Sequence, residues 1–211
     1  MVLLPAVGIG LLIGFLTRGS LAGFGLARFR LLPLLLLAVF IQVLIFTPIL
    51  GQTAFVDSTG QYIYMATILL TLVVYYKNVH IPGLVIILVG ALLNGLVIFA
   101  NGGYMPTRAE LLDEAGRLEN VQQSEEAQAA GERMTHTNSV ISDDDTPLEF
   151  LGDIFALPDD WPLSNVYSIG DIFIAVGAAA TTARAMHLKP ASGQWARHPE
   201  NEPDLTKPEP A

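Results

Sequence analysis

The sequence contains no cysteine, so disulfides, thiolate metal sites and cysteine nucleophiles are all excluded. Charged residues are scarce as well, at 15% of the 211 positions, against about a quarter in soluble domains. Basic side chains are the scarcer kind, with 11 Lys and Arg against 20 Asp and Glu. Because nucleic-acid binding needs clustered Lys and Arg to neutralise phosphates, this balance excludes a nucleic-acid partner.

The sequence also lacks the side-chain patterns of most catalytic and cofactor sites. It has no nucleophile–base pair, no phosphate-binding loop and no pair of haem ligands. The four histidines show no ligand spacing, and the acidic run 143–145 lacks the spacing of an EF-hand loop, so a solvated acidic run accounts for it. We therefore predict no catalytic residue, no cofactor and no metal site, although these absences do not exclude an enzyme.

What the sequence has in excess is apolar residues, at 52% of positions and a mean hydropathy of +0.49. They gather in charge-free runs, and two runs exceed the roughly 20 residues that cross about 30 Å of hydrocarbon. We therefore expect an all-α integral membrane protein with five transmembrane helices. The runs place these helices at about 2–17, 31–50, 61–76, 82–100 and 169–186.

Lys and Arg lie unevenly around the expected helices, and the positive-inside rule converts this into an orientation. Loops 18–30 and 77–81 and the tail after residue 183 hold eight of these residues, against three in the long loop before the fifth helix. The count predicts an outside N-terminus, a cytoplasmic C-terminus and an extracytoplasmic long loop. The expected organisation is a four-helix membrane region at 1–101, an acidic loop with amphipathic helices at 102–168, the fifth helix at 169–187 and a disordered Pro-rich tail at 188–211.

Three helix-start signatures suggest that the long loop is partly helical. Thr107-Arg108-Ala109-Glu110 and Thr146-Pro147-Leu148-Glu149 have the pattern of a capping box, and Ser168-Ile169-Gly170-Asp171 has the same pattern with Asp in place of Glu. The second signature predicts a short amphipathic helix, lying on the membrane surface or packed on the bundle. The third predicts the start of the last helix.

Small residues recur at helical spacing in three of the expected helices. Ala6, Gly10 and Gly14 form one such seam, and a seam of alanines follows in the last helix. In the fourth helix Gly83, Gly90, Asn94 and Asn101 share one face. Such faces allow close helix contact and hydrogen bonds across it, so packing explains them. The alternative is that Asn94 and Asn101 line a polar cavity for a lipid or quinone head group.

Two further motifs can be read either as helix ends or as a site. The run 101–106, Asn-Gly-Gly-Tyr-Met-Pro, suits a helix C-cap but is denser in special residues than a cap requires. The segment 151–155, Leu-Gly-Asp-Ile-Phe, recurs as Ile-Gly-Asp-Ile-Phe at 169–173, either by chance or as two Gly-Asp corners that meet. The candidate ligand or structural site is Asn94, Asn101, Gly102, Gly103, Met105, Pro106, Gly152, Asp153, Ser168, Gly170 and Asp171.

These motifs, together with an apolar first helix that ends in Thr-Arg-Gly-Ser at 17–20, resemble a bacterial multi-pass membrane protein family of unknown function. The resemblance covers about residues 1–187, with the segment 108–145 and the Pro-rich tail as additions. It implies location in the bacterial cytoplasmic (inner) membrane with the large loop outside, and it supplies no activity.

Two functions remain open from the sequence. The first is a non-catalytic accessory or scaffold subunit of a larger bacterial membrane complex, because the seams suit helix partners and the central helices lack ionisable groups. Its partners would be membrane lipids and other membrane protein subunits. The alternative is a lipid- or quinone-binding protein, possibly an enzyme, with a site at the outer membrane surface. A small transporter is the weakest reading, since no inverted repeat is present.

Overall fold

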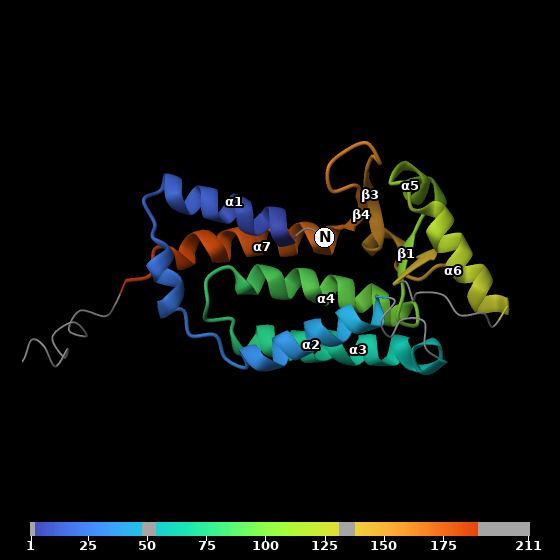
Figure 1. Ribbon diagram of the computed structural model, residues 1–211, viewed down its shortest axis with the longest axis horizontal. Helices are drawn as coiled ribbons and strands as arrows, with labels where there is room; N and C mark the ends of the chain where they lie inside the picture. The colour runs from blue at the N-terminus through green and yellow to red at the C-terminus, as the bar shows by residue number, and fades with distance from the viewer. Residues whose placement is uncertain (1–2, 48–53, 131–137, 190–211) are drawn as a thin grey trace, which may run out of the picture.

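The apolar runs of the sequence form five helices of 14 to 24 residues that lie side by side in the computed structural model (Figure 1). The structure describes residues 3–47, 54–130 and 138–189. The predicted disordered tail therefore lies, from residue 190 on, outside the described residues. The five helices are α1 (Leu3–Leu16), α2 (Leu32–Ile45), α3 (Ala54–Lys77), α4 (Leu84–Ala100) and α7 (Ile169–Ala185).

Helix α7 is the centre of this bundle, since it packs along both α4 and α1, while α2 packs on α3 and α3 on α4. The predicted small-residue seams form these contacts. Residues Ala6, Gly10 and Gly14 are the buried residues of α1. A Cβ added at Gly90 of α4 would strike the backbone of Gly170 in α7. The prediction that these faces pack against other helices is confirmed.

A small sheet with two helices forms the other part of the molecule, at one end of the bundle (Figure 1). The strand order is β2-β1-β3-β4, with β1 parallel to both β2 and β3, and with β3 and β4 paired as an antiparallel hairpin. The strands are β1 (Met105–Thr107), β2 (Ser139–Ile141), β3 (Asp153–Leu157) and β4 (Asn165–Ser168). The helices are α5 (Ala109–Glu114) and α6 (Leu118–Ala130), and the 3-10 turns are η1 (Leu21–Leu26) and η2 (Glu149–Leu151).

Two apolar clusters hold the sheet in place. Leu112, Ala115 and Val121 of the α5–α6 region are buried against Val166 of β4. A second cluster, formed by Tyr64, Val97, Ile98 and Met105, joins β1 to α3 and α4. Because β1 is anchored to the bundle and β4 runs directly into α7, the sheet is fixed to the helices at two points.

The prediction of an all-α protein with five membrane-spanning helices is wrong. The structure contains a four-stranded mixed sheet, and nowhere in the described ranges does a helix combine the length and the apolar character that a membrane crossing requires. Helices α1 and α2 have 14 residues and α4 and α7 have 17. At 1.5 Å per residue they extend over roughly 21–26 Å, less than about 30 Å of hydrocarbon. The inside–outside orientation deduced for those spans loses its basis with them.

The three helix-start signatures have different outcomes. A helix, α5, does begin at the first one, but its capping box is not formed: Thr107 ends strand β1, and the N-cap is Arg108 with no side-chain cap. The second signature is wrong. The hydroxyl of Thr146 bonds the Asp143 carboxylate in an exposed turn, and the expected amphipathic helix after it is strand β3. Pairing with β1 and β4 supplies the backbone hydrogen bonds of this segment, so tertiary context overrides its local helix signal. The third signature is confirmed, because Ser168 and Asp171 form a complete capping box.

Candidate functional site: a polar cavity with two aspartates

A cavity of about 210 Å³ lies where the helix bundle meets the sheet. Each of the four strands contributes at least one residue to its wall. The remainder come from α3, α4 and α7, from the segment between α5 and α6, and from Asn138 just before β2. The lining is mainly polar. It comprises Tyr64, Asn94, Ile98, Met105, Arg117, Asn138, Ser139, Asp153, Asn165, Val166 and Asp171.

One wall of the cavity is a hydrogen-bonded triad from α4 and the start of α7. The amide nitrogen Nδ2 of Asn94 donates to Oδ1 of Asp171 over 3.0 Å, and the hydroxyl of Ser168 donates to Oδ1 of Asn94 over 2.8 Å. The backbone N–H of Ser168 donates to Oδ2 of Asp171 over 3.2 Å. Both carboxylate oxygens of Asp171 therefore have a donor, and its side chain is held in one orientation.

Gly170 allows this triad to form. A Cβ at residue 170 would collide with the side-chain oxygen of Asn94 and would also lie close to the backbone oxygen of Gly90. Only a residue without a side chain lets α4 and α7 approach this closely. The glycine of this Gly-Asp corner thus places the asparagine beside the aspartate.

Asp153, the first residue of β3, also lines the cavity. Its side chain is almost completely buried, with 8% of the residue exposed, and the hydroxyl of Thr107 donates to its Oδ2 over a long 3.4 Å. Burial, and then the nearby Asp171 carboxylate, raise the pKa of Asp153 from 3.8 to about 7, against smaller opposing effects of the Thr107 hydroxyl and Arg117. Asp153 can therefore hold or release a proton near neutral pH.

Neutral donors and one cation complete the lining. Burial raises the pKa of Tyr64 to about 12, so its hydroxyl stays protonated beside the side chain of Asn138. The ring of Tyr64 meets that of Phe46 edge to face, with centroids 4.9 Å apart. The guanidinium of Arg117 donates to the side-chain oxygen of Asn165. The cavity thus combines two carboxyl groups, several carboxamides and one guanidinium.

The structure brings some of the predicted site residues together and separates others. Asn94, Met105, Asp153 and Asp171 line the cavity. Three other predicted residues lie next to these. The hydroxyl of Ser168 donates to Asn94. Gly152 lies too close to Pro106 for a Cβ, and Gly170 lies too close to Asn94 for one. The two Gly-Asp corners therefore do meet at one cavity.

The remaining predicted residues form a helix end. Asn101 is the C-cap of α4, and its Nδ2 donates to the backbone oxygens of Val97 and Pro147 over 2.8 and 2.9 Å. Gly102 and Gly103 have φ angles of 64° and 104°, in the left-handed region that favours glycine. The capping interpretation accounts for all three residues. Pro106 lies buried in β1 next to Met105.

Sequence reasoning missed five polar residues of the cavity: Tyr64, Arg117, Asn138, Ser139 and Asn165. Asn165 opens a strand rich in β-branched and aromatic residues, and the Pro-Asp-Asp run at 158–160 precedes it, so a hairpin signal was present. Arg117 and Asn138 come from irregular segments with no pattern of their own. Tyr64 lies in the expected third helix and is buried in the interior, where the sequence gives no sign of a cavity.

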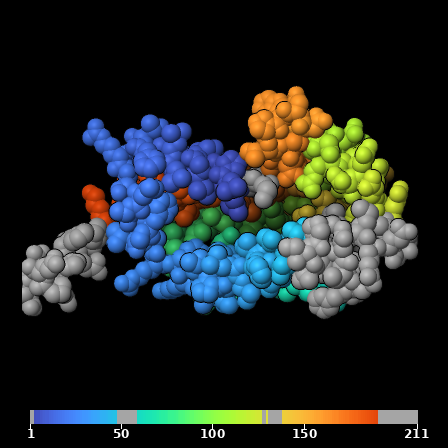
Figure 2. Space-filling view, viewed as in Figure 1, coloured from blue at the N-terminus to red at the C-terminus, as the bar shows by residue number. Residues whose placement is uncertain are grey.

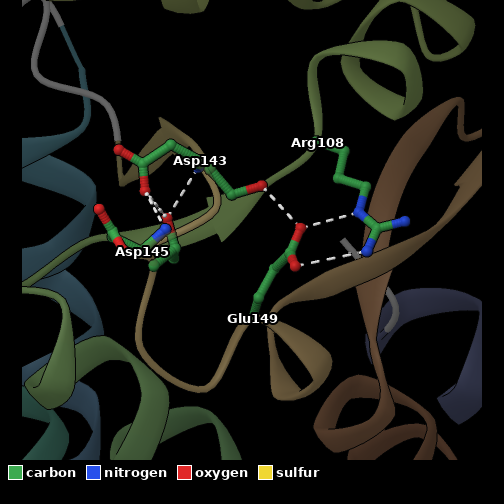
Figure 3. A network of polar contacts seen from close by, with 6 residues as sticks. Arg108, Asp143, Asp145 and Glu149 are labelled. Atoms are coloured by element: carbon green, nitrogen blue, oxygen red, sulfur yellow. Dashed lines mark hydrogen bonds and ion pairs between the residues drawn. The ribbon is translucent and has the colours of Figure 1, made fainter.

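A second polar cluster lies at the surface (Figure 3). Arg108 forms an ion pair with Glu149 at 2.7 Å, and the hydroxyl of Ser142 donates to the same carboxylate over 3.1 Å. The carboxylate of Asp143 accepts hydrogen bonds from its own turn, from the Thr146 hydroxyl and the Asp145 N–H. Among the described residues no group of three or more His, Asp or Glu could hold a metal ion. This cluster is a hydrogen-bonded turn.

An apolar groove of about 510 Å³ lies on the other side of the β3–β4 hairpin. Pro5, Ala6 and Ile9 of α1 form one wall, facing the hairpin and one side of α7. Figure 2 shows it as the notch between the blue surface of α1 and the orange surface of the hairpin. Asp171 and Ile172 follow one another in α7, yet the first lines the polar cavity and the second the apolar groove.

Comparison with known proteins assigns the chain to a family without assigning it an activity. Residues 26–182 match the model of a family of unknown function, DUF5317. The matched segment includes every residue that lines the polar cavity. No curated protein and no solved structure matches the chain. An uncharacterised family was predicted from the sequence motifs, and on the extent of this match the chain belongs to the DUF5317 family of unknown function.

Proposed function

We propose that the protein binds a lipid-class molecule whose polar head group occupies the cavity between Asn94, Asp153 and Asp171. The observation that carries this proposal is Asp153. It is a nearly buried carboxyl group with a single long hydrogen bond among the described residues. Buried polar groups in folded proteins are almost always satisfied by protein or solvent. A carboxyl group held this way at a cavity wall is suited to a ligand that completes its hydrogen bonds.

The neighbouring groups support the same proposal. Asp171 and Asn94 are held in place by the helix cap, so they need no rearrangement to meet a ligand. Fixed orientation lowers the entropy that binding costs. Several side-chain amides in the wall offer both donors and acceptors, which suits a head group rich in polar atoms.

The apolar surface supports a lipid-class ligand rather than a small polar metabolite. Leu4 and Leu16 of α1 are each 75% exposed, and Leu36 and Phe40 of α2 are 60% and 58% exposed. Contiguous exposed apolar surface marks contact with lipid, ligand or protein. We propose that these helices contact lipid of a bacterial inner membrane.

A non-catalytic accessory subunit is the second candidate. The same exposed faces of α1 and α2 favour it, because apolar helix surfaces are also covered by partner subunits. In this case the polar cavity would stabilise the junction between bundle and sheet and would hold no ligand. Its partners would be other membrane protein subunits.

Mass spectrometry after extraction from native membranes separates these two functions. We expect the wild-type protein to carry an enriched lipid or quinone, and the Asp153→Asn variant to lose it while the variant melts as a folded protein. Asp160→Asn removes one charge from an exposed position near the hairpin tip and is the matched control. Stoichiometric partner proteins with no enriched lipid would overturn ligand binding in favour of the accessory subunit.

A further inference from the structure

We infer that the polar cavity selects a ligand with a primary ammonium group, held between Asp153 and the fixed carboxylate of Asp171. The inference rests on the proposed function and names the chemistry of the head group. The group could belong to a lipid such as phosphatidylethanolamine or to a soluble amine. The argument starts from the charges that face the cavity.

The acidic groups of the cavity are not neutralised by an ion pair within the described residues. Asp153 and Asp171 both line it, and their charges act on one another. The one cation of the lining, Arg117, directs its guanidinium to the side-chain oxygen of Asn165. The ion pair found in the described ranges, between Arg108 and Glu149, lies outside the cavity. Buried charges require a partner of opposite sign, and a cationic ligand supplies it.

Hydrogen-bond capacity points to the same chemistry. An ammonium group has three donors and no acceptor. Asp171 already accepts from Asn94 and from the backbone N–H of Ser168, whereas the hydrogen bond that Thr107 donates to Asp153 reaches Oδ2 alone and is 3.4 Å long. Oδ1 of Asp153 is therefore open to a donor, as far as the described residues extend. An ammonium placed there would also be attracted by the Asp171 carboxylate across the cavity.

The size of the cavity, about 210 Å³, leaves room for a head group such as an ethanolamine unit. A negatively charged head group would meet two carboxyl groups, against the single guanidinium of Arg117. The cavity is therefore expected to reject anions.

Binding of an amine should depend on pH through Asp153. The titratable groups that face Asp153 are Tyr64 from α3, Asp171 from α7 and Arg117 from the turn before α6. Tyr64 keeps its proton at neutral pH, because burial raises its pKa to about 12. An amine stays protonated to about pH 10. Affinity is thus expected to rise as Asp153 loses its proton and to fall on acidification.

The test uses the purified full-length protein and three probes of similar size: ethanolamine, neutral ethylene glycol and anionic glycolate. Isothermal titration at pH 8 should show binding of ethanolamine and none of the other two. Asp153→Asn should lower the affinity for ethanolamine about tenfold or more, because the ammonium group loses a charged hydrogen-bond partner. Asp160→Asn should leave the affinity unchanged. Thermal melting of each variant checks that it is folded.

A second measurement does not depend on any variant. In the wild-type protein ethanolamine affinity should fall between pH 8 and pH 6, whereas a surface effect would leave it constant. The source of the amine is then distinguished with vesicles. If the protein binds vesicles of phosphatidylethanolamine mixed with phosphatidylglycerol, but not vesicles of phosphatidylglycerol alone, the ligand is the lipid. If it binds ethanolamine but shows no preference between the two kinds of vesicle, the ligand is a soluble amine.

The outcomes separate failure of the inference from failure of the proposed function. If ethylene glycol or glycolate binds and the Asn94→Ala substitution abolishes that binding, the cavity is a ligand site but the ammonium inference is wrong. If no probe binds and no lipid accompanies the protein from native membranes, both are wrong. If ethanolamine binds equally to wild type and Asp153→Asn at every pH, the amine binds elsewhere and the inference is again wrong.

Discussion

Asn94 in α4 and Asp171 in the first turn of α7 are joined by a hydrogen bond of 3.0 Å across 77 residues of sequence. The same asparagine accepts from the hydroxyl of Ser168 over 2.8 Å. One side chain therefore connects the fourth helix to the residue at which the sheet ends and the last helix begins. The stability of this junction is open to direct test.

Replacing Asn94 with Ala should lower the free energy of unfolding by about 1–3 kcal/mol. The change leaves the Ser168 hydroxyl and one oxygen of Asp171 without their partner in a partly buried site. Urea denaturation followed by circular dichroism measures the difference. Asn94→Asp, which keeps an acceptor for Ser168 but places a second carboxylate against Asp171, should be at least as destabilising; a neutral result would show that the triad contributes nothing.

Two glycine substitutions should have opposite effects. Gly170→Ala would place a Cβ against the Asn94 side chain and the Gly90 backbone, so we expect a loss of about 1–3 kcal/mol, as for an overpacked core. Gly8 lies in α1 with nothing within 4 Å of an added Cβ. Gly8→Ala should stabilise by up to about 1 kcal/mol through helix propensity. Thermal melting of the two variants side by side gives the comparison.

Alanine substitution can show which helix-start signature caps a helix, the one at Ser168 or the one at Thr146. Ser168→Ala removes a capping hydroxyl that accepts from the Asp171 N–H over 3.0 Å, and should cost about 1 kcal/mol or more. Thr146→Ala removes a hydroxyl from an exposed turn that caps no helix, and should change stability by less than about 0.5 kcal/mol. Equal losses in chemical denaturation would contradict the assignment of Thr146 to a turn.

Stability should fall as pH rises from about 4 to 7. The pKa of Asp153 is raised in the folded protein to about 7 from 3.8, so in this window the folded state keeps a proton that the unfolded chain has released. The stabilisation is complete below about pH 4 and is lost as the pH rises through the folded pKa. A shift of this size corresponds to something on the order of 4 kcal/mol.

Comparison with Asp153→Asn isolates this contribution from other titrating groups. The amide is neutral at every pH, so the difference in unfolding free energy between variant and wild type should change in favour of the variant from pH 4 to pH 7. Urea titrations at four pH values measure the difference. A constant difference across the window would show that Asp153 ionises at its ordinary pKa.

The helices could be predicted from the sequence because each depends on a local pattern. The expected bounds 82–100 and 169–186 agree closely with α4 and α7. The seam through Gly10 and Gly14 is buried as predicted, and Gln42 donates to Thr67 of the neighbouring α3 over 2.9 Å, as expected for a polar residue in an apolar helix. Apolar length does not itself distinguish a bundle helix of 17 residues from a membrane span, and there the prediction failed.

The sheet could not be predicted from local pattern alone. Strands β1 and β2 have three residues each and pair in parallel across a long connection, so their hydrogen bonds depend on distant segments. Thr107 illustrates the conflict: its spacing to Glu110 suits a helix cap, yet as the last residue of β1 it pairs with Ile141 of β2 and with Asp153 of β3. Long-range pairing decided the structure of this segment.

The site was predictable where it uses helix-end chemistry and was not predictable where it uses the sheet. Ser168 and Asp171 could be found from the capping pattern, and Asn94 from its position on a small-residue face. The repeat of the Gly-Asp pair at 152–153 and 170–171 indicated that Asp153 and Asp171 lie close together. Tyr64 and Arg117 had no such pattern, because only the fold brings α3 and the α5–α6 turn to the same cavity.

Ser168 is both the last residue of β4 and the N-cap of α7, so no loop separates the hairpin from the helix. Any rotation of the hairpin must be carried along α7 as a stiff rod of roughly 26 Å, or else bend it. At the far end of this rod His187 meets Thr17 at 2.8 Å, and the Ser20 N–H bonds the Met186 oxygen. Helix α7 therefore connects the hairpin directly to the turn between α1 and η1, with no loop at the hairpin end and with hydrogen bonds at the other.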